Sequence, residues 1–124
     1  MARIFISYRR DDSRETALQL LAALKPHFIV FMDVEGILVG KDFRATVERE
    51  LLAAQVVLIV IGTQWVTITG KDGSRRLDKL DDLVRIEAEM ALRHDKIVIP
   101  VLVNGATMPT ADELPRSLSQ LPFL

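Results

Sequence analysis

Residues 56–61 read Val56-Val57-Leu58-Ile59-Val60-Ile61, and this stretch decides the fold class of the 124-residue chain. A continuous apolar run is typical of a strand that is buried on both faces, as the strands of a parallel sheet are. Three further strands are expected. Arg3–Tyr8 and Phe28–Met32 precede it in the chain, and Ile97–Val103 follows it. Because segments with helical patterning separate these strands, we expect an α/β domain of the flavodoxin-like type, a three-layer fold with a central parallel sheet.

Apolar residues at helical spacing predict one helix in each interval between the strands: Ser13–Leu24, Lys41–Ala54 and Leu80–Arg93. Asp12 is the expected N-cap of the first helix, because Glu15 follows three residues later as in a capping box, and Pro26 ends the helix. The long segment Gly62–Lys79 contains glycines and mixed charges and indicates a surface loop. Its lone Trp65 either folds over a ligand site or anchors the loop to the core, and we favour the anchor.

The composition excludes several classes of function. Lysine and arginine number 16 against 17 aspartates and glutamates, so the net charge of −1 lacks the basic surplus of a dedicated nucleic-acid binder. With no cysteine and two separated histidines, the chain predicts no disulfide, no thiol nucleophile and no metal site. Its apolar runs are shorter than the roughly 18 residues of a membrane span, and the residues before the first strand do not predict a secretory signal. We therefore expect one cytoplasmic domain over residues 1–124, with neither a membrane nor a nucleic acid as partner.

Polar loops follow the predicted strands at the edge where parallel sheets bind ligands. Residues Tyr8–Asp12 follow the first strand, Asp33–Gly40 follow the second, and the long loop follows Ile61. The chain contains neither a dinucleotide-binding fingerprint nor a Walker sequence. Any nucleotide must therefore be held without a glycine-rich phosphate loop.

Glu87 does not fit the helix that contains it. On a helical wheel it lies near the centre of a broad apolar arc, whereas the other charged residues gather on the opposite face: Asp82, Arg85, Glu89 and Arg93. An unpartnered buried charge is very costly. Glu87 therefore either forms a structural ion pair with Arg9 or Arg10, or opens onto a cleft in which it does chemistry. The wheel alone leaves both interpretations open.

Five separated motifs resemble, in the same order, those of the Toll/interleukin-1 receptor (TIR) domain in its bacterial branch: Phe5–Arg10, Val30–Glu35 with Gly40–Phe43, Ile61–Trp65, Asp82–Glu87 and Ile99–Val103. The resemblance spans Arg3 to about Pro115. The family normally adds a fifth strand and a last helix, so the resemblance implies a domain lacking the final strand and helix. The chain is then a C-terminally truncated domain or a fragment of a longer protein.

The resemblance implies an enzyme that cleaves the nicotinamide–ribose bond of NAD, which is a substrate here and not a resident cofactor. Its catalytic glutamate matches Glu87. Nicotinamide leaves NAD as a neutral molecule and needs no proton, so one carboxylate that stabilises the ribosyl cation is sufficient. Water as acceptor gives ADP-ribose, and an adenine nitrogen gives a cyclic product. The resemblance also implies a role in bacterial defence or cell-death signalling.

The same resemblance implies contacts between the substrate and eight residues: Ser7, Tyr8, Arg9, Arg10, Asp33, Lys41, Phe43 and Leu83. The two arginines suit the diphosphate, because guanidinium groups fork onto phosphate oxygens, although arginines in a turn are often simply solvated. Ser7 either touches substrate or caps its loop, and Phe43 either closes over a base or packs in the core. Leu83 stands where catalytic relatives often carry an aromatic ring, so apolar contact is kept and stacking is lost.

An apolar loop tip points to assembly as a second function. The segment Val34-Glu35-Gly36-Ile37-Leu38-Val39-Gly40 places three apolar residues between two glycines, and exposed apolar tips are often interaction sites. The resemblance implies self-association through TIR domains, in which this loop inserts into a neighbour and completes a composite active site. It also implies an additional sensor domain or subunit. A purely non-enzymatic assembly module remains the alternative.

A phosphoacceptor receiver domain is a third class, because it also carries an acidic pair after its first strand, as Asp11 and Asp12 do here. A receiver needs an aspartate at the end of its third strand. This chain has Ile61-Gly62-Thr63 there, so receiver function is not expected.

Overall fold

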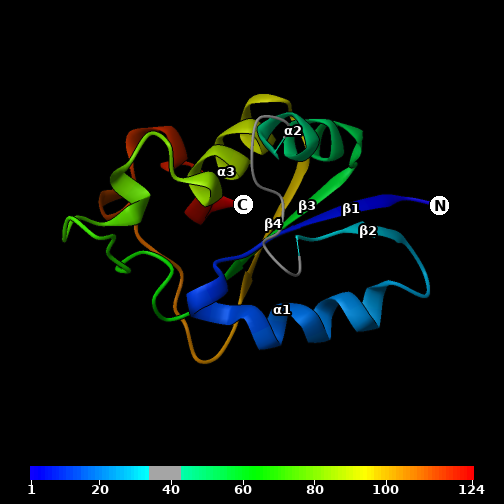
Figure 1. Ribbon diagram of the computed structural model, residues 1–124, viewed down its shortest axis with the longest axis horizontal. Helices are drawn as coiled ribbons and strands as arrows, with labels where there is room; N and C mark the ends of the chain where they lie inside the picture. Colours follow the sequence, from blue (N-terminus) through cyan, green and yellow to red (C-terminus); the bar gives the residue numbers. More distant parts are fainter. Residues whose placement is uncertain (34–42) are drawn as a thin grey trace.

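The computed structural model describes residues 1–33 and 43–124, and Figure 1 shows their arrangement in layers. Within these described residues, four strands form one sheet: β1 (Arg3–Ser7), β2 (Ile29–Phe31), β3 (Val56–Ile61) and β4 (Ile97–Leu102). All pairs are parallel and the order is β2-β1-β3-β4. The predicted α/β domain with a parallel sheet is therefore confirmed, and β3 has the predicted bounds.

Helices lie on both faces of the sheet (Figure 1). Helix α1 (Arg10–Leu24) packs on one face, over a buried cluster of alternate strand residues: Ile4, Ile6, Leu58 and Val60. Helices α2 (Phe43–Ala53) and α3 (Leu83–Arg93) pack on the other, where the core is larger and includes Phe5, Val57, Ile59, Ile61 and Trp65. Strand residues alternate between the two clusters because successive side chains of a strand point to opposite faces.

The edge strands are less buried than their apolar sequences predict. Ile29 in β2 is 43% exposed, and Ile97 and Ile99 in β4 are 61% and 44% exposed. The continuous apolar run Phe28–Met32 therefore does not make β2 a strand that is buried on both faces. An edge strand has a neighbour on one side only. Of the helices that the structure describes, only α1 covers the face on which Ile97 and Ile99 lie beside Val56 and Leu58.

The first helix begins three residues before the predicted position. It starts at Arg10, its N-cap is Arg9 without a side-chain cap, and Ser13 departs from helical geometry with φ −147° and ψ 27°. The prediction that Asp12 caps this helix was wrong. Its carboxylate instead accepts hydrogen bonds from the backbone N–H groups of Gly62 (2.9 Å) and Gln64 (2.8 Å), beyond the end of β3.

The third helix begins later than predicted, at Leu83. Asp82 is its N-cap and accepts a hydrogen bond from the backbone N–H of Arg85 at 3.1 Å. Leu80, the predicted first residue of this helix, precedes it and is 78% exposed. Asp82 explains this boundary, because its backbone is extended and its carboxylate satisfies a free N–H of the first helical turn.

Residues 103–124, all of them described, follow β4 with three single turns of 3-10 helix: Ala111–Glu113, Arg116–Leu118 and Leu121–Phe123. Leu118 and Leu121 are fully buried in the cluster beneath α2 and α3. Within the described ranges 1–33 and 43–124, no helix has the length and apolar character that crossing a membrane requires.

Candidate functional site at the carboxyl edge of the sheet

The site forms where β1 ends beside α3. Ser7, the last residue of β1, donates a hydrogen bond from Oγ to Oε1 of Glu87 at 2.6 Å. Both residues are buried, with Ser7 1% and Glu87 7% exposed. Glu87 thus lies on the inward face of α3, as the helical wheel predicts, and the structure brings it together with Ser7, one of the expected substrate contacts.

The environment of Glu87 favours its neutral form. Burial raises the pKa of its carboxyl from an ordinary 4.5 to about 8. The hydrogen bond from Ser7 and the charge of Arg9 lower this pKa, the carboxylates of Asp82 and Asp33 raise it, and burial outweighs them all. A carboxyl group whose pKa is strongly perturbed, at the carboxyl edge of a parallel sheet, is a candidate for catalysis.

Arg9 is held in a buried ion pair. Its guanidinium forms a bidentate ion pair with Asp82, with Nη1–Oδ1 and Nη2–Oδ2 distances of 2.9 and 2.7 Å. Its Nε donates to the carbonyl oxygen of Trp65 at 3.0 Å, and the group lies 5.9 Å from the centre of that indole ring. Arg9 is 3% exposed. This buried pair takes the place of the ion pair with Glu87 that the sequence left open, and the expected contact of Arg9 with a diphosphate stays a prediction.

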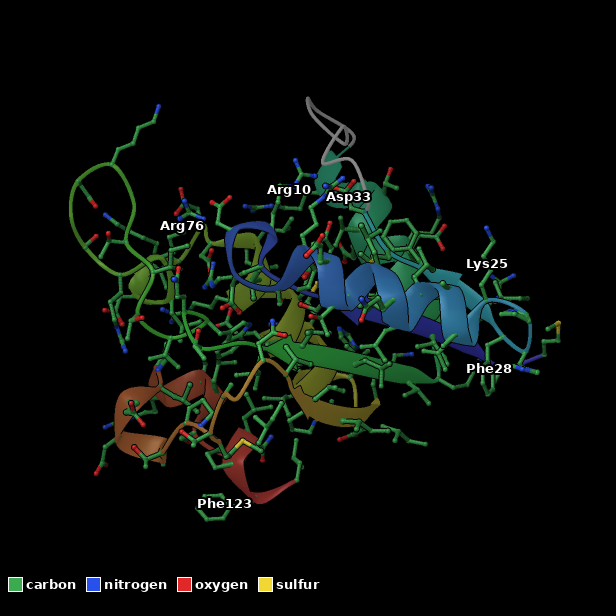
Figure 2. The ribbon with its side chains drawn as sticks, turned by 90° about the horizontal axis from the view of Figure 1, so that it is seen from below. Arg10, Lys25, Phe28, Asp33, Arg76 and Phe123 are labelled. Atoms are coloured by element: carbon green, nitrogen blue, oxygen red, sulfur yellow. The ribbon has the colours of Figure 1, made fainter. Side chains whose placement is uncertain are left out.

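Tyr8, Arg10 and Asp33 meet on the other side of the β1 terminus. The hydroxyl of Tyr8 donates to the backbone oxygen of Asp33 at 2.5 Å, which joins the ends of β1 and β2. Burial raises the pKa of Tyr8, and a hydrogen bond with Arg10 opposes that shift. Arg10 is exposed, and Figure 2 shows it at the start of α1 with Asp33 nearby. Of the two arginines, Arg10 is therefore the one whose side chain reaches solvent at this edge.

Two other expected contacts lie on helices. Leu83, in the first turn of α3, is half-buried and packs against the core cluster beneath α2 and α3. Phe43 is the first residue of α2, and its side chain is not among those that the structure describes. Lys41 and the whole expected assembly loop, residues 34–40, also lie outside the described residues.

The structure adds residues that the sequence did not assign to the site. Asp82 was expected on the solvated face of α3, but its side chain is 9% exposed and pairs with Arg9. Trp65 is fully buried, which confirms the interpretation of a core anchor. No local pattern indicates the Arg9–Asp82 pair, because its partners are 73 residues apart in the chain.

A separate hollow of about 190 Å³ lies at the carboxyl ends of β3 and β4. The residues that line it include Gly62, Thr63, Thr67, Gly105 and Thr107. Glu87 and Ser7 do not line it, so it is distinct from the candidate site.

The fold and site define a class: α/β domains with a short parallel sheet and a buried carboxyl group at its carboxyl edge. Within that class, the chain belongs to the TIR domain family, whose family model matches residues 4–123. The family resemblance inferred from the five motifs is therefore confirmed.

Two similar proteins illustrate the relationship. The chain is 28% identical over 121 residues to the NAD(+) hydrolase tir-1 of Caenorhabditis elegans, in an alignment that covers 95% of this chain. The chain spans only 12% of that protein's length. Its fold is also similar to the TIR domains in a structure of the activated Roq1 resistosome directly recognising the pathogen effector XopQ. That match has a TM-score of 0.65 and 16% identity, and it covers 99% of this chain and 69% of the other.

Proposed function

We propose that this TIR domain hydrolyses NAD at the nicotinamide–ribose bond and that Glu87 is its catalytic residue. The observation that carries the proposal is the buried carboxyl of Glu87, held by Ser7 at the carboxyl edge of the sheet. Membership of the TIR family and the similarity to a protein named as an NAD(+) hydrolase support it.

The chemistry requires an anion near the ribose and no general acid. Nicotinamide departs as a neutral base, and water adds to the anomeric carbon to give ADP-ribose and a proton. Closure by an adenine nitrogen would give the cyclic product instead. The positive charge that develops on the ribose is the feature that a carboxylate stabilises.

Protonation of Glu87 would be coupled to binding of NAD. At neutral pH the raised pKa keeps this carboxyl mostly neutral in the free protein. The nicotinamide ring of NAD is a cation, and an opposite charge within a few ångströms favours the ionised form of a carboxyl group. Substrate would therefore create the carboxylate that its own cleavage needs, and NAD is a substrate in this scheme rather than a resident cofactor.

The remaining contacts are proposed from the same edge. The described residues that we propose to contact NAD are Ser7, Tyr8, Arg10, Asp33 and Leu83, with Lys41 and Phe43 expected from the sequence. Arg10 is suited to the diphosphate because it is exposed and its guanidinium matches phosphate oxygens. The absence of cysteine is compatible with a reducing compartment, and we propose the cytoplasm.

The activity assay tests this function directly. Concentrated protein is incubated with NAD, and nicotinamide, ADP-ribose and cyclic products are separated by chromatography. Glu87→Ala is run beside Glu89→Ala, which removes a partly exposed carboxylate from the same helix. We expect nicotinamide from the wild type and from Glu89→Ala, and none from Glu87→Ala. Absence of turnover in the wild type at high concentration would favour the non-enzymatic assembly module.

We propose further that self-association activates the domain. Glu87 is 7% exposed, so access of a ribose requires rearrangement at this edge, and docking of a neighbour could supply the energy. The apolar tip formed by Ile37 and Leu38 is the proposed contact. Replacing both residues with aspartate should give a monomer in sedimentation experiments and lower the NAD turnover at least tenfold. A strictly monomeric variant with full activity would contradict this mode of activation.

A further inference from the structure

The buried ion pair between Arg9 and Asp82 has no part in the chemistry proposed for Glu87. The Arg9 and Asp82 side chains are 2% and 9% exposed, and two parallel hydrogen bonds of 2.9 and 2.7 Å join them. The third donor of the guanidinium, Nε, is held by the Trp65 carbonyl. Because the guanidinium is planar, these three contacts fix both the distance and the orientation of the Arg9 side chain relative to Asp82 and the Trp65 carbonyl.

The pair spans the same two elements that carry Ser7 and Glu87. Arg9 lies two residues beyond Ser7 in the segment that leaves β1, and Asp82 lies five residues before Glu87 at the N-cap of α3. Asp82 also accepts a hydrogen bond from the backbone N–H of Arg85, so the pair is bonded to the first turn of the helix. Any shift of that turn relative to β1 would change the Ser7–Glu87 contact.

We propose that Arg9 and Asp82 are positioning residues, whose ion pair holds α3 against the end of β1 and so fixes the carboxyl of Glu87 on Ser7. The inference rests on the proposed NAD cleavage. Neither residue is required to touch the substrate, because each acts through the placement of Glu87.

The two members of the pair also act on the charge of Glu87 in opposite directions. Among the described residues, the groups that face Glu87 are Ser7 and Arg9 from the end of β1, Asp33 from the end of β2, and Asp82 from α3. The charge of Asp82 raises the pKa of Glu87, and the charge of Arg9 lowers it. Loss of Asp82 or of Arg9 should therefore shift the pKa of Glu87 in opposite directions, whereas general loosening of the fold gives no such pair of opposite shifts.

The test compares four variants of the full chain by steady-state kinetics with NAD as substrate across pH 5–9. Asp82→Asn keeps the shape and one oxygen for the Arg85 N–H, and Arg9→Met keeps the apolar stem. Each single variant leaves one buried charge without its partner and could fail to fold. The double variant removes both charges, so the test can still be made if a single variant does not fold. Glu89→Gln is the matched control, because it breaks the Arg85–Glu89 pair on the same helix, away from Glu87.

We expect kcat to fall at least tenfold in both single variants and in the double variant, with KM changed less than threefold. The midpoint of the pH profile of kcat/KM should move down in Asp82→Asn, move up in Arg9→Met, and return near the wild-type value in the double variant. Glu89→Gln should match the wild type. Wild-type kcat and midpoint in folded variants would overturn the inference, whereas wild-type protein that releases no nicotinamide would overturn the proposed function itself.

Discussion

Replacing Glu87 with glutamine should make the protein more stable at alkaline pH. The carboxyl group is buried, and its pKa is raised to about 8, whereas in the unfolded chain it returns to about 4.5. Between these two pH values the native state keeps a proton that the unfolded state has lost. The free energy of unfolding of the wild type therefore falls as pH rises from about 4.5 to about 8, and levels off above that.

The size of the effect follows from the width of this window. At about 1.36 kcal/mol per pH unit, the interval between 4.5 and about 8 corresponds to roughly 4 to 5 kcal/mol as an upper limit. Relaxation around an ionised group reduces such penalties, so we expect a difference of about 2 to 4 kcal/mol at pH 9. Glutamine cannot ionise, and its amide oxygen still accepts the hydrogen bond from Ser7. At pH 4 the two proteins should have nearly equal stability.

Urea unfolding followed by circular dichroism at pH 4, 6, 7.5 and 9 measures this difference. Glu89→Gln is the control, because Glu89 is partly exposed and pairs with Arg85 on the outer side of α3. The stability of Glu87→Gln relative to the wild type should rise steadily with pH, and that of Glu89→Gln should not. Parallel curves for Glu87→Gln and the wild type would show that Glu87 is not held neutral in the native protein.

Three further predictions follow from named contacts. Gly62→Ala should lower stability by about 1 to 3 kcal/mol in thermal unfolding, because the added Cβ would lie 2.5 Å from Oδ1 of Asp12, which already accepts a hydrogen bond from Gln64. An unchanged Tm would show that the Asp12 carboxylate moves away from residue 62 at little cost. Asp12→Ala should cost about 1 to 3 kcal/mol in urea unfolding, because it removes the acceptor for the Gly62 and Gln64 N–H groups, and a neutral effect would count against it. Ser7→Ala should raise the midpoint of the pH profile of NAD cleavage, because the hydrogen bond from Ser7 lowers the pKa of Glu87; a downward shift would contradict this assignment.

The elements of this fold that the sequence predicts best are those whose burial is periodic or continuous. The apolar run of β3 lies in the middle of the sheet, so its bounds are the predicted ones, whereas β2 and β4 are edge strands with exposed isoleucines. The position of Glu87 on the inward face of α3 could be predicted because a wheel depends only on local spacing. The starts of α1 and α3 were misplaced for different reasons: Asp12 bonds to backbone that is remote in sequence, and Asp82 caps α3 at a later position than the apolar spacing indicates.

Those remote contacts explain which parts of the site could not be predicted. Asp12 has the spacing of a helix cap, yet it bonds to backbone 50 and 52 residues further along the chain. Arg9 reads as a solvated turn or a phosphate ligand, yet it is buried against Asp82 and Trp65. In each case a local pattern was satisfied equally well by a tertiary partner, and the sheet topology decides which partner is within reach.

The decisive measurement for Glu87 as the catalytic carboxylate is the rate of nicotinamide release at saturating NAD, compared between wild type and Glu87→Gln at the same protein concentration. Glutamine keeps the shape of the side chain and the Ser7 contact, so the comparison isolates the negative charge. We expect a kcat at least about 100-fold lower for Glu87→Gln, in a protein that is folded and no less stable than the wild type. A variant that keeps more than about a tenth of the wild-type kcat would contradict the assignment of Glu87 as the catalytic carboxylate.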